Sequence, residues 1–414
     1  MLVGIDIGSH KVCTLVGEAL PGGGVRVHGM GHAPSDGIRH GEVVHIEDAA
    51  GAIAASVERA ERVAGQSITR ARIGVSGLHL AGANNNGFVP CGRRPRTIEQ
   101  ADVERALEVA GSVLLRDDRS VLHVLARHYT VDDGGPVDSP VDMEGHRLEA
   151  AVHIVTAAHS ALANLLRCLE LAEVRPVGLT MSTLAAAEAT LSEDERELGV
   201  VVIDLGAAVT GIACYVDGAL CHTAVLPVGG RHMTNDLGVV LQTPLAEAER
   251  IKLSHGHVLP ELDDDEATIE IVPFGDDKRR ATTRLHVAEV LAARADEIAS
   301  LVAIELGQAG LATRLAAGAV LVGGGTELTG MPKRLGARLG LPARVGTPGD
   351  VLGLADAARG PGHAAPIGLL RWEATSTSDA ASVFTTEPEP TDGLGRIVSW
   401  ARHAFLPNGN GHHR

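Results

Sequence analysis

The sequence predicts an α/β protein with two lobes related by duplication. Two stretches about two hundred residues apart share one pattern, in which an apolar run ends in Asp, one apolar residue, Gly and a turn. A second apolar run follows each turn, which is typical of two strands joined by a hairpin. At 414 residues, the chain is also long enough for two or more domains. The two stretches are Val3–Val12 and Val201–Thr210.

Regular elements are expected along most of the chain. Apolar residues that recur every three or four positions predict helices, and short apolar runs between turn residues predict strands. The expected strands cover residues 1–20 (two strands joined by a turn at Gly8), Val25–Gly31, Arg72–Ser76, Val152–Thr156 and Ala319–Val322, and the expected helices cover 46–64, 98–110, 159–173, 180–191, 245–253 and 288–306.

Changes in composition divide the chain further. Asn, Pro and Gly turns set residues 82–150 apart as an inserted subdomain, and the Ser, Thr, Glu and Pro content of 373–392 predicts a flexible linker. The expected division is a first lobe (1–81 and 151–195, with part of 350–372), that inserted subdomain, a second lobe (196–230 and 291–349), a second inserted subdomain (231–290), the linker, and a terminal helix (393–406).

Composition narrows the functional classes. A formal charge of −16 argues against a nucleic-acid partner, and 2% aromatic residues leave little for base stacking. The five cysteines show no CxxC spacing, which favours a reduced cytoplasmic compartment. The twenty histidines never form HExxH and are expected on the surface or in the core rather than on metals. Neither a signal peptide nor a membrane-spanning helix is expected.

Asp6 and Asp204 each follow a buried strand at the start of a turn. Burying a carboxylate is costly unless a counter-charge or hydrogen-bond donors compensate it, and water-bound Mg²⁺ would do so. The first turn, Gly8-Ser9-His10-Lys11, offers backbone N–H groups, a hydroxyl and a cation to phosphate oxygens. One such turn alone is equally well explained by an Asp that caps a hairpin. Two copies at this spacing favour a nucleotide cleft between the lobes.

Two further segments are candidates for the same cleft. Gly323-Gly324-Gly325-Thr326 follows an apolar strand, and glycines there would let a ligand approach the backbone closely. The alternative is a tight turn with no function. Glu249 and Lys252 lie three residues apart on one face of a predicted helix, where a surface ion pair is the alternative.

The chain end predicts a basic amphipathic helix behind the linker. Its polar side carries Arg396, Ser399, Arg402 and His403. A basic helix with Trp and Phe on its apolar side is typical of membrane-surface anchors, whereas docking on the protein's own body is the alternative. The apolar residues expected to meet lipid are Leu394, Ile397, Val398, Trp400, Ala401, Phe405 and Leu406.

These features together resemble a known family. The two Asp-Gly turns and the GGGT segment are similar to those of the actin, Hsp70 and sugar-kinase ATPase superfamily. Within it, almost the whole chain resembles the FtsA family of bacterial cell-division proteins. The supporting segments are Ser76–His79, Val121–Val124, Leu191–Val200 (the closest), Gly218–Thr223, Ala246–Gly256 and the amphipathic terminal helix.

The resemblance implies a two-lobed actin-like, ribonuclease H-like ATPase fold that holds ATP and Mg²⁺. Asp6 and Asp204 would hold the Mg²⁺ through water, and Glu249 and Lys252 would reach the ribose and base. The other implied ATP contacts are Gly8, Ser9, His10 and Lys11 in the first phosphate loop, Gly206, Ala207 and Thr210 in the second, and Gly323, Gly324, Gly325 and Thr326 beside the adenosine.

The family resemblance also implies partners and a location. The chain would polymerise, bind the C-terminal tail of FtsZ through residues 231–290, contact anionic lipid and recruit downstream division proteins. Its place would be the cytoplasmic face of the cell membrane at the septum. A soluble ATPase of the same superfamily, or a pilus assembly protein similar to PilM, is the alternative.

One departure from the family pattern concerns the second phosphate loop. Many members have GGGT there, whereas this chain has Gly206-Ala207-Ala208-Val209-Thr210. Alanine adds a Cβ where the backbone must approach phosphate and disfavours positive φ. We therefore expect ATP binding with slow or absent hydrolysis.

Overall fold

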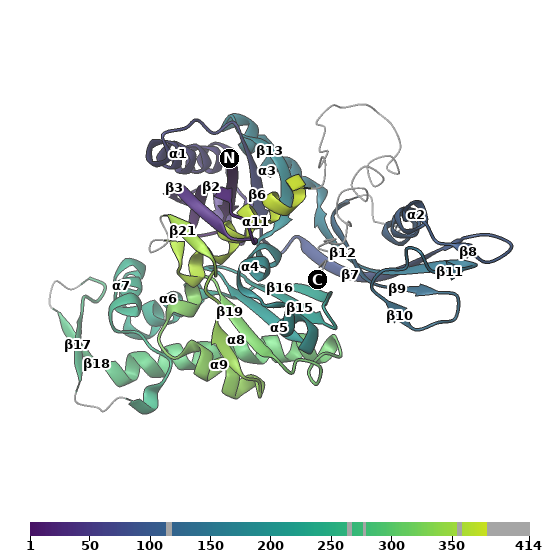
Figure 1. The fold of residues 1–414 in the computed structure, drawn as a ribbon. Coiled ribbons are helices and arrows are strands. Elements are labelled where there is room, and N and C mark those ends of the chain that lie inside the picture. Colours follow the sequence, from purple (N-terminus) through teal and green to yellow (C-terminus); the bar gives the residue numbers. More distant parts are fainter. Residues whose placement is uncertain (113–117, 263–266, 276–278, 354–357, 379–414) are drawn as a thin grey trace.

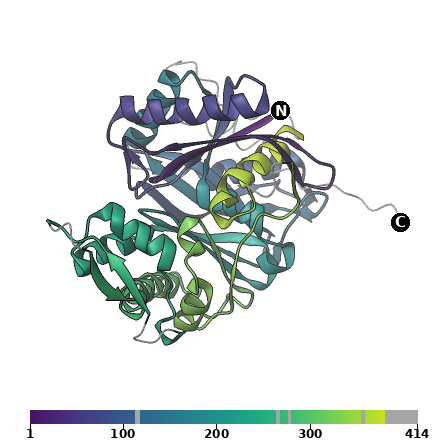
Figure 2. The ribbon, with the colours of Figure 1, turned by 90° about the vertical axis from the view of Figure 1, so that its left-hand side faces the viewer.

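The computed structural model describes residues 1–112, 118–262, 267–275, 279–353 and 358–378. They form two lobes, one above the other in Figure 1, and a third unit that projects to one side. Each lobe is built around a central sheet with helices packed against it, and the side view in Figure 2 separates the two lobes clearly. The predicted α/β class is therefore confirmed.

The first lobe contains a six-stranded sheet in the order β13-β6-β1-β2-β3-β21. Helices cover both of its faces, because Ile5 of β1 packs in one core with Ile53 of α1, whereas Leu15 of β2 packs in another with Ile367 of α11. Its elements are β1 (Leu2–Ile7), β2 (Lys11–Ala19), β3 (Val25–Pro34), β4 (Ile38–Arg39), β5 (Glu42–Val43), α1 (Ile46–Ala64), β6 (Arg70–Val75), α3 (His159–Leu171), β13 (Arg175–Met181), α4 (Ser182–Thr190), β21 (Val351–Gly353), η3 (Pro361–His363) and α11 (Ala364–Ser378).

Two strands of this sheet, β13 and β21, are absent from the sequence prediction. A helix was expected over residues 180–191, but β13 occupies Arg175–Met181 and α4 begins only at Ser182. The strand contains Pro176 and a register shift beside it, features that resemble a turn in the sequence. Proline is tolerated there because β13 lies at the edge of the sheet.

The second lobe repeats the first. β14 runs antiparallel to β15 and parallel to β19, just as β1 runs antiparallel to β2 and parallel to β6. The duplication predicted from the two Asp-Gly stretches is thus present in the strand pairing. The elements are α5 (Glu193–Leu198), β14 (Val200–Leu205), β15 (Thr210–Val216), β16 (Ala219–Leu226), α6 (Gly230–Leu241), α7 (Leu245–His255), η1 (Pro260–Leu262), β17 (Thr268–Ile271), β18 (Arg280–Thr283), α8 (Arg284–Gln308), β19 (Gly318–Val322), η2 (Gly324–Glu327), α9 (Met331–Leu339) and β20 (Ala343–Val345).

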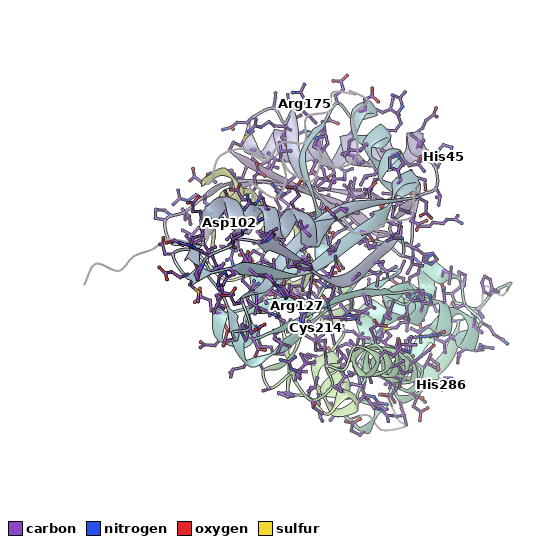
Figure 3. All side chains as sticks on the ribbon, turned by 90° about the vertical axis from the view of Figure 1, so that its right-hand side faces the viewer. His45, Asp102, Arg127, Arg175, Cys214 and His286 are labelled. Atoms are coloured by element: carbon purple, nitrogen blue, oxygen red, sulfur yellow. The ribbon has the colours of Figure 1, made fainter. Side chains whose placement is uncertain are left out.

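The projecting unit is a four-stranded sheet in the order β10-β9-β12-β7, with α2 against one face. Asp102 lies on α2 (Figure 3) and is buried. The guanidinium of Arg96 donates two hydrogen bonds of 2.7 Å to the Asp102 carboxylate. The boundary expected at residue 150 falls within β12, which pairs with β7 and β9 along its length. The elements are β7 (Leu80–Pro90), β8 (Arg96–Thr97), α2 (Gln100–Gly111), β9 (Arg119–Val131), β10 (Pro136–Val137), β11 (Glu144–Gly145) and β12 (Arg147–Ala158).

Two predictions from the sequence concern membranes. None of the helices in the described part of the chain is long and apolar enough to cross a bilayer. The amphipathic helix expected over residues 393–406, with most of the linker before it, lies outside the described residues.

A buried ion pair attaches α11 to the first sheet. The Nε of Arg72 in β6 donates to Glu373 Oε2 at 2.8 Å, and its Nη1 donates to the hydroxyl of Thr180 at 3.2 Å. The two charged side chains are only 6% and 8% exposed. Removing one partner would leave the other charge buried without compensation.

We therefore predict that Glu373→Gln lowers the free energy of unfolding by about 3–5 kcal/mol in urea denaturation. The matched control is Glu18→Gln, which removes the partner of Arg26 in an exposed ion pair of the same 2.8 Å length. That change should cost less than about 1 kcal/mol. Equal losses in the two variants would contradict the structural role assigned to the buried pair.

Candidate functional site

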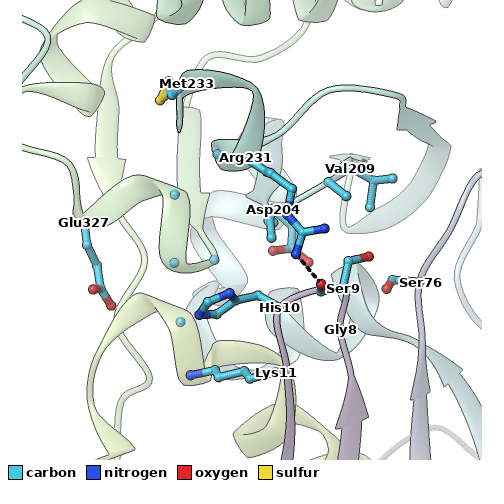
Figure 4. Close-up of a pocket in the computed structure, with 18 of the residues that line it drawn as sticks. Gly8, Ser9, His10, Lys11, Ser76, Asp204, Val209, Arg231, Met233 and Glu327 are labelled. Carbon is cyan, nitrogen blue, oxygen red and sulfur yellow. Dashed lines mark hydrogen bonds between the residues drawn. The ribbon is translucent and has the colours of Figure 1, made fainter. Parts of the chain in front are cut away.

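A cavity of about 790 Å³ lies between the two lobes. Both duplicated turns line it, one from each lobe, together with the glycine segment after β19 and one side of α7. Figure 4 shows the first turn facing Asp204 and Arg231 across this space. The predicted site residues that line it are Asp6, Gly8, Ser9, His10, Lys11, Asp204, Gly206, Ala207, Glu249, Lys252, Gly323, Gly324 and Gly325.

The two turns have the same backbone geometry. Gly8 N donates to Lys11 O at 3.1 Å, and Gly206 N donates to Val209 O at the same distance. Each hydrogen bond closes a hairpin turn that begins at the glycine directly after Asp and one apolar residue. Ala207 and Ala208 avoid positive φ in the second turn, so their side chains cause no backbone strain there.

Arginine from the second lobe reaches the first turn. Arg231, at the start of α6, donates from Nη2 to the carbonyl of Ser9 at 2.9 Å (Figure 4). Its own backbone N–H donates to Ala207 O at 2.7 Å. One residue therefore ties α6 to both turns and brings a cation to the cavity. The Ser9 hydroxyl is engaged elsewhere, since it accepts a 2.8 Å hydrogen bond from Gly41 N.

The carboxylates of Asp6 and Asp204 occupy the base of the cavity. Ser182 donates to Asp6 Oδ1 at 2.8 Å, and Thr183 donates to Asp204 Oδ2 at 3.5 Å. Burial raises the pKa of Asp6, an effect that the hydroxyl of Ser182 and the charge of Lys11 oppose. Burial and the neighbouring Asp6 charge raise the pKa of Asp204 to about 7. Lys11 thus compensates the burial of the pair only in part, since the pKa values of both carboxyls remain raised, and a divalent cation would supply further positive charge.

Glycine is required in the segment after β19. Gly323 has φ of +85°, and a Cβ on it would lie 2.6 Å from Asp204 Oδ1. A Cβ on Gly325 would lie 2.5 Å from Leu205 Cγ. Such contacts are too short for any side chain, so these glycines let the segment pack against the second Asp turn. The GGGT segment is thus part of the cavity rather than an isolated turn.

Glu249 and Lys252 form a polar cluster on the cavity side of α7. Their ion pair measures 2.7 Å. Lys252 also donates to Gly230 O at 3.2 Å and to the hydroxyl of Thr234 at 2.8 Å, while that hydroxyl donates to Glu249. These contacts fix the ion pair to α6, so it lines the cavity instead of the open surface.

Two predicted residues lie apart from the cavity. Thr210 is fully buried, as is every residue of β15, and its hydroxyl donates to Val228 O at 2.7 Å. Thr326 donates to Gly323 O at 2.7 Å and thereby closes η2. Neither lines the cavity in the described structure. Both threonines therefore support the loops that carry the site.

Further polar residues that the sequence did not predict line the cavity, among them Ser182, Thr183, Arg231 and Thr234. Ser182 and Thr183 begin α4, whereas the sequence predicted a helix that starts two residues earlier, at position 180. The Gly229-Gly230 pair before Arg231 is a signal that could have drawn attention to the start of α6. The residues expected to meet lipid lie outside the described part of the chain.

Comparison with known proteins identifies the family. The model described as cell division protein FtsA matches residues 201–368, and that of the SHS2 domain inserted in FtsA matches residues 77–156. Cell division protein FtsA of Pseudomonas aeruginosa is 36% identical over 411 residues, covering 98% of each chain. The chain belongs to the FtsA family. FtsA of Escherichia coli K12 is 34% identical over 416 residues, again covering 98% of each chain.

Solved structures agree with an actin-like fold. PilM in a PilM-PilN type IV pilus biogenesis complex superposes with a TM-score of 0.65 at 17% identity, covering 90% of this chain and 98% of that one. MreB5 of Spiroplasma citri bound to AMPPNP gives a TM-score of 0.53 at 14% identity, covering 91% and 97%. At such identities the likeness concerns the fold alone. The predicted FtsA identity and actin-like fold are confirmed.

The raised pKa of Asp204 predicts a pH-dependent stability. The pKa of Asp204 is 3.8 in the unfolded chain and about 7 in the folded chain. At pH values between the two, Asp204 is protonated in the folded chain but ionised in the unfolded chain. The free energy of unfolding therefore falls as pH rises through this window. Asp204→Asn removes that loss, so its melting temperature should exceed that of the wild type by more at pH 8 than at pH 5.

The control is Asp217→Asn, at a side chain that is 78% exposed in a surface ion pair. Its melting temperature should follow that of the wild type at both pH values. An Asp204→Asn variant whose difference from the wild type is the same at pH 5 and pH 8 would contradict the electrostatic description of the cavity.

Proposed function

We propose that this FtsA-family protein binds ATP with Mg²⁺ in the cavity between its lobes. The single observation that supports this most is the pairing of two buried carboxylates, whose charge Lys11 compensates only in part, at the ends of duplicated strands. Asp6 and Asp204 would hold Mg²⁺ through water, and the backbone N–H groups of the two turns would meet the phosphates. Bound Mg²⁺ would supply the positive charge that phosphates and carboxylates both need.

The remaining cavity walls suit the nucleoside. Glu249 is a hydrogen-bond acceptor fixed by Lys252 and Thr234, a suitable partner for ribose hydroxyls. Gly324 and Gly325 offer backbone without side chains on the other side. His10 and Lys11 bring polar and charged groups to the phosphate end. Slow or absent hydrolysis stays a prediction, which phosphate release would measure.

We further propose that the protein works as a membrane tether for division filaments. ATP would favour a closed cleft that is competent to polymerise, and polymers would multiply the weak lipid affinity of one short helix. The FtsZ C-terminal tail is the proposed partner of residues 231–290, and downstream division proteins are further partners. The location would be the cytoplasmic face of the membrane at the septum.

The charge distribution supports the tether. The chain carries a net charge of −16, yet the predicted terminal helix carries two arginines and no acidic residue between Leu394 and Leu406. Only this end of the molecule would be attracted to anionic lipid. A soluble actin-like ATPase would not need such a helix, and neither would a PilM-like protein that acts through a peptide-binding partner.

Co-sedimentation with anionic vesicles in the presence of ATP and Mg²⁺ tests the tether. We expect the full chain to pellet and Val398→Glu to stay largely in solution, because the charge falls on the apolar side of the helix. The matched control, Ser399→Glu, places the same charge on the polar side and should retain most of the binding. Loss of binding in neither variant, or equal loss in both, would contradict lipid insertion and favour the soluble alternatives.

A further inference from the structure

Three metal-ligating side chains meet beside the first phosphate turn. Cys13 of β2 lies directly opposite His32 of β3 in the antiparallel register. His363, the last residue of η3, comes from more than three hundred positions away. One ligand atom from each residue lies within 4.8 Å of the other two.

The separation of the two imidazoles suits one shared ion. The Nε2 atoms of His32 and His363 are 3.4 Å apart. In a tetrahedral zinc site, with Zn–N bonds of about 2.0–2.1 Å, two nitrogen ligands are separated by roughly 3.4 Å. The rings are tilted by 50° with centroids 5.3 Å apart, so they do not stack. The Nε2 atoms of His32 and His363 are therefore spaced so that both could bind a single cation.

The hydrogen bonding of the cluster is incomplete. The Nδ1 atoms of His32 and His363 are buried without a hydrogen-bond partner in the described structure. Buried polar atoms without partners are rare in folded proteins, but an ion bound through the Nε2 atoms would not pair these Nδ1 atoms. What the ion would explain is why two half-buried imidazoles face each other. The Cys13 side chain is fully buried at the same place, in an otherwise apolar core with Leu15 and Ile367.

We propose that Cys13, His32 and His363 form a site for one thiophilic divalent cation of the Zn²⁺ class. A thiolate and two imidazoles are the ligands that such ions prefer over carboxylate-binding Mg²⁺. Binding displaces the thiol proton of Cys13 to solvent. Three protein ligands leave a fourth tetrahedral position for water or another ligand. None of the three ligands is among the residues proposed to hold the nucleotide, although Pro361 and Gly362 of η3 line that cavity.

Lys11 connects the two sites. Its Nζ lies 3.4 Å from His363 Nε2, the nitrogen that would bind the ion. An ammonium group there competes with a metal cation, so Lys11 must turn away when the ion binds. The cavity offers a place for it, because Lys11 also lines the nucleotide site. Without a metal, the Lys11 ammonium would donate to the one lone pair of His363 Nε2, and this hydrogen bond would hold Lys11 in place.

Titration of the reduced, metal-free full chain with Co²⁺ tests the proposal, because thiolate ligation to Co²⁺ gives a charge-transfer band in the near ultraviolet. We expect one equivalent to produce this band in the wild type, and Cys13→Ser to abolish it. His363→Gln should weaken binding by at least about tenfold, and Lys11→Met should strengthen it. Cys168→Ser, at another buried free cysteine, is the matched control and should keep the band.

A second measurement guards against misfolding of the Cys13 variant. Zn²⁺ should raise the melting temperature of the wild type and of Cys168→Ser, but not that of His363→Gln, whose side chain is only partly buried. A missing thiolate band in the wild type, or a band that persists in Cys13→Ser, would overturn the proposal. The hydrogen bond from Lys11 to His363 would then explain the cluster.

Discussion

The architecture depends on two carboxylates that share one cleft. Asp6 and Asp204 end equivalent strands of the two lobes, and each raises the cost of ionising the other. Ser182 and Thr183 stabilise them only in part, since a hydroxyl brings no opposite charge. A folded chain keeps such a pair only where a ligand compensates it or the fold tolerates protonation. The duplication thus places two carboxylates at the centre of the molecule, where their negative charge needs compensation.

The surroundings of this pair join the lobes. Arg231 of the second lobe donates to the Ser9 carbonyl of the first, and Gly323 N donates to Pro361 O at 2.9 Å. The lobes also share a hydrophobic core, since Ile73 of β6 and Val202 of β14 belong to one cluster of buried residues. Ligand-dependent closure would therefore act on the short polar contacts at the cleft and on this shared core.

The sequence predicted the parts of the fold that depend on local pattern. Helix α1 coincides with its predicted range because its apolar residues keep a regular helical spacing. Strand β13 escaped prediction because Pro176 and a glycine interrupt it, and only its edge position makes them acceptable. The Asp and Gly positions of the cavity could be predicted because the motif occurs twice.

Residues brought together by tertiary structure could not be predicted in this way. Arg231 and Ser182 carry no motif of their own, and their roles depend on where α6 and α4 begin. The sequence predicted that the histidines lie on the surface or in the core and do not bind metals. Metal binding by Cys13, His32 and His363 would contradict this expectation. These residues lie in three separate segments, so no spacing rule could have connected them.

The most direct measurement of the central claim is a double-mutant cycle of Asp6→Asn and Asp204→Asn on ATP affinity, by calorimetry with Mg²⁺ and with a chelator. The account predicts that each single variant loses at least about tenfold in affinity with Mg²⁺ and that the double variant loses little more. Affinity in chelator should change little. Losses that add, or that are equal with and without Mg²⁺, would contradict a shared cation between the two lobes.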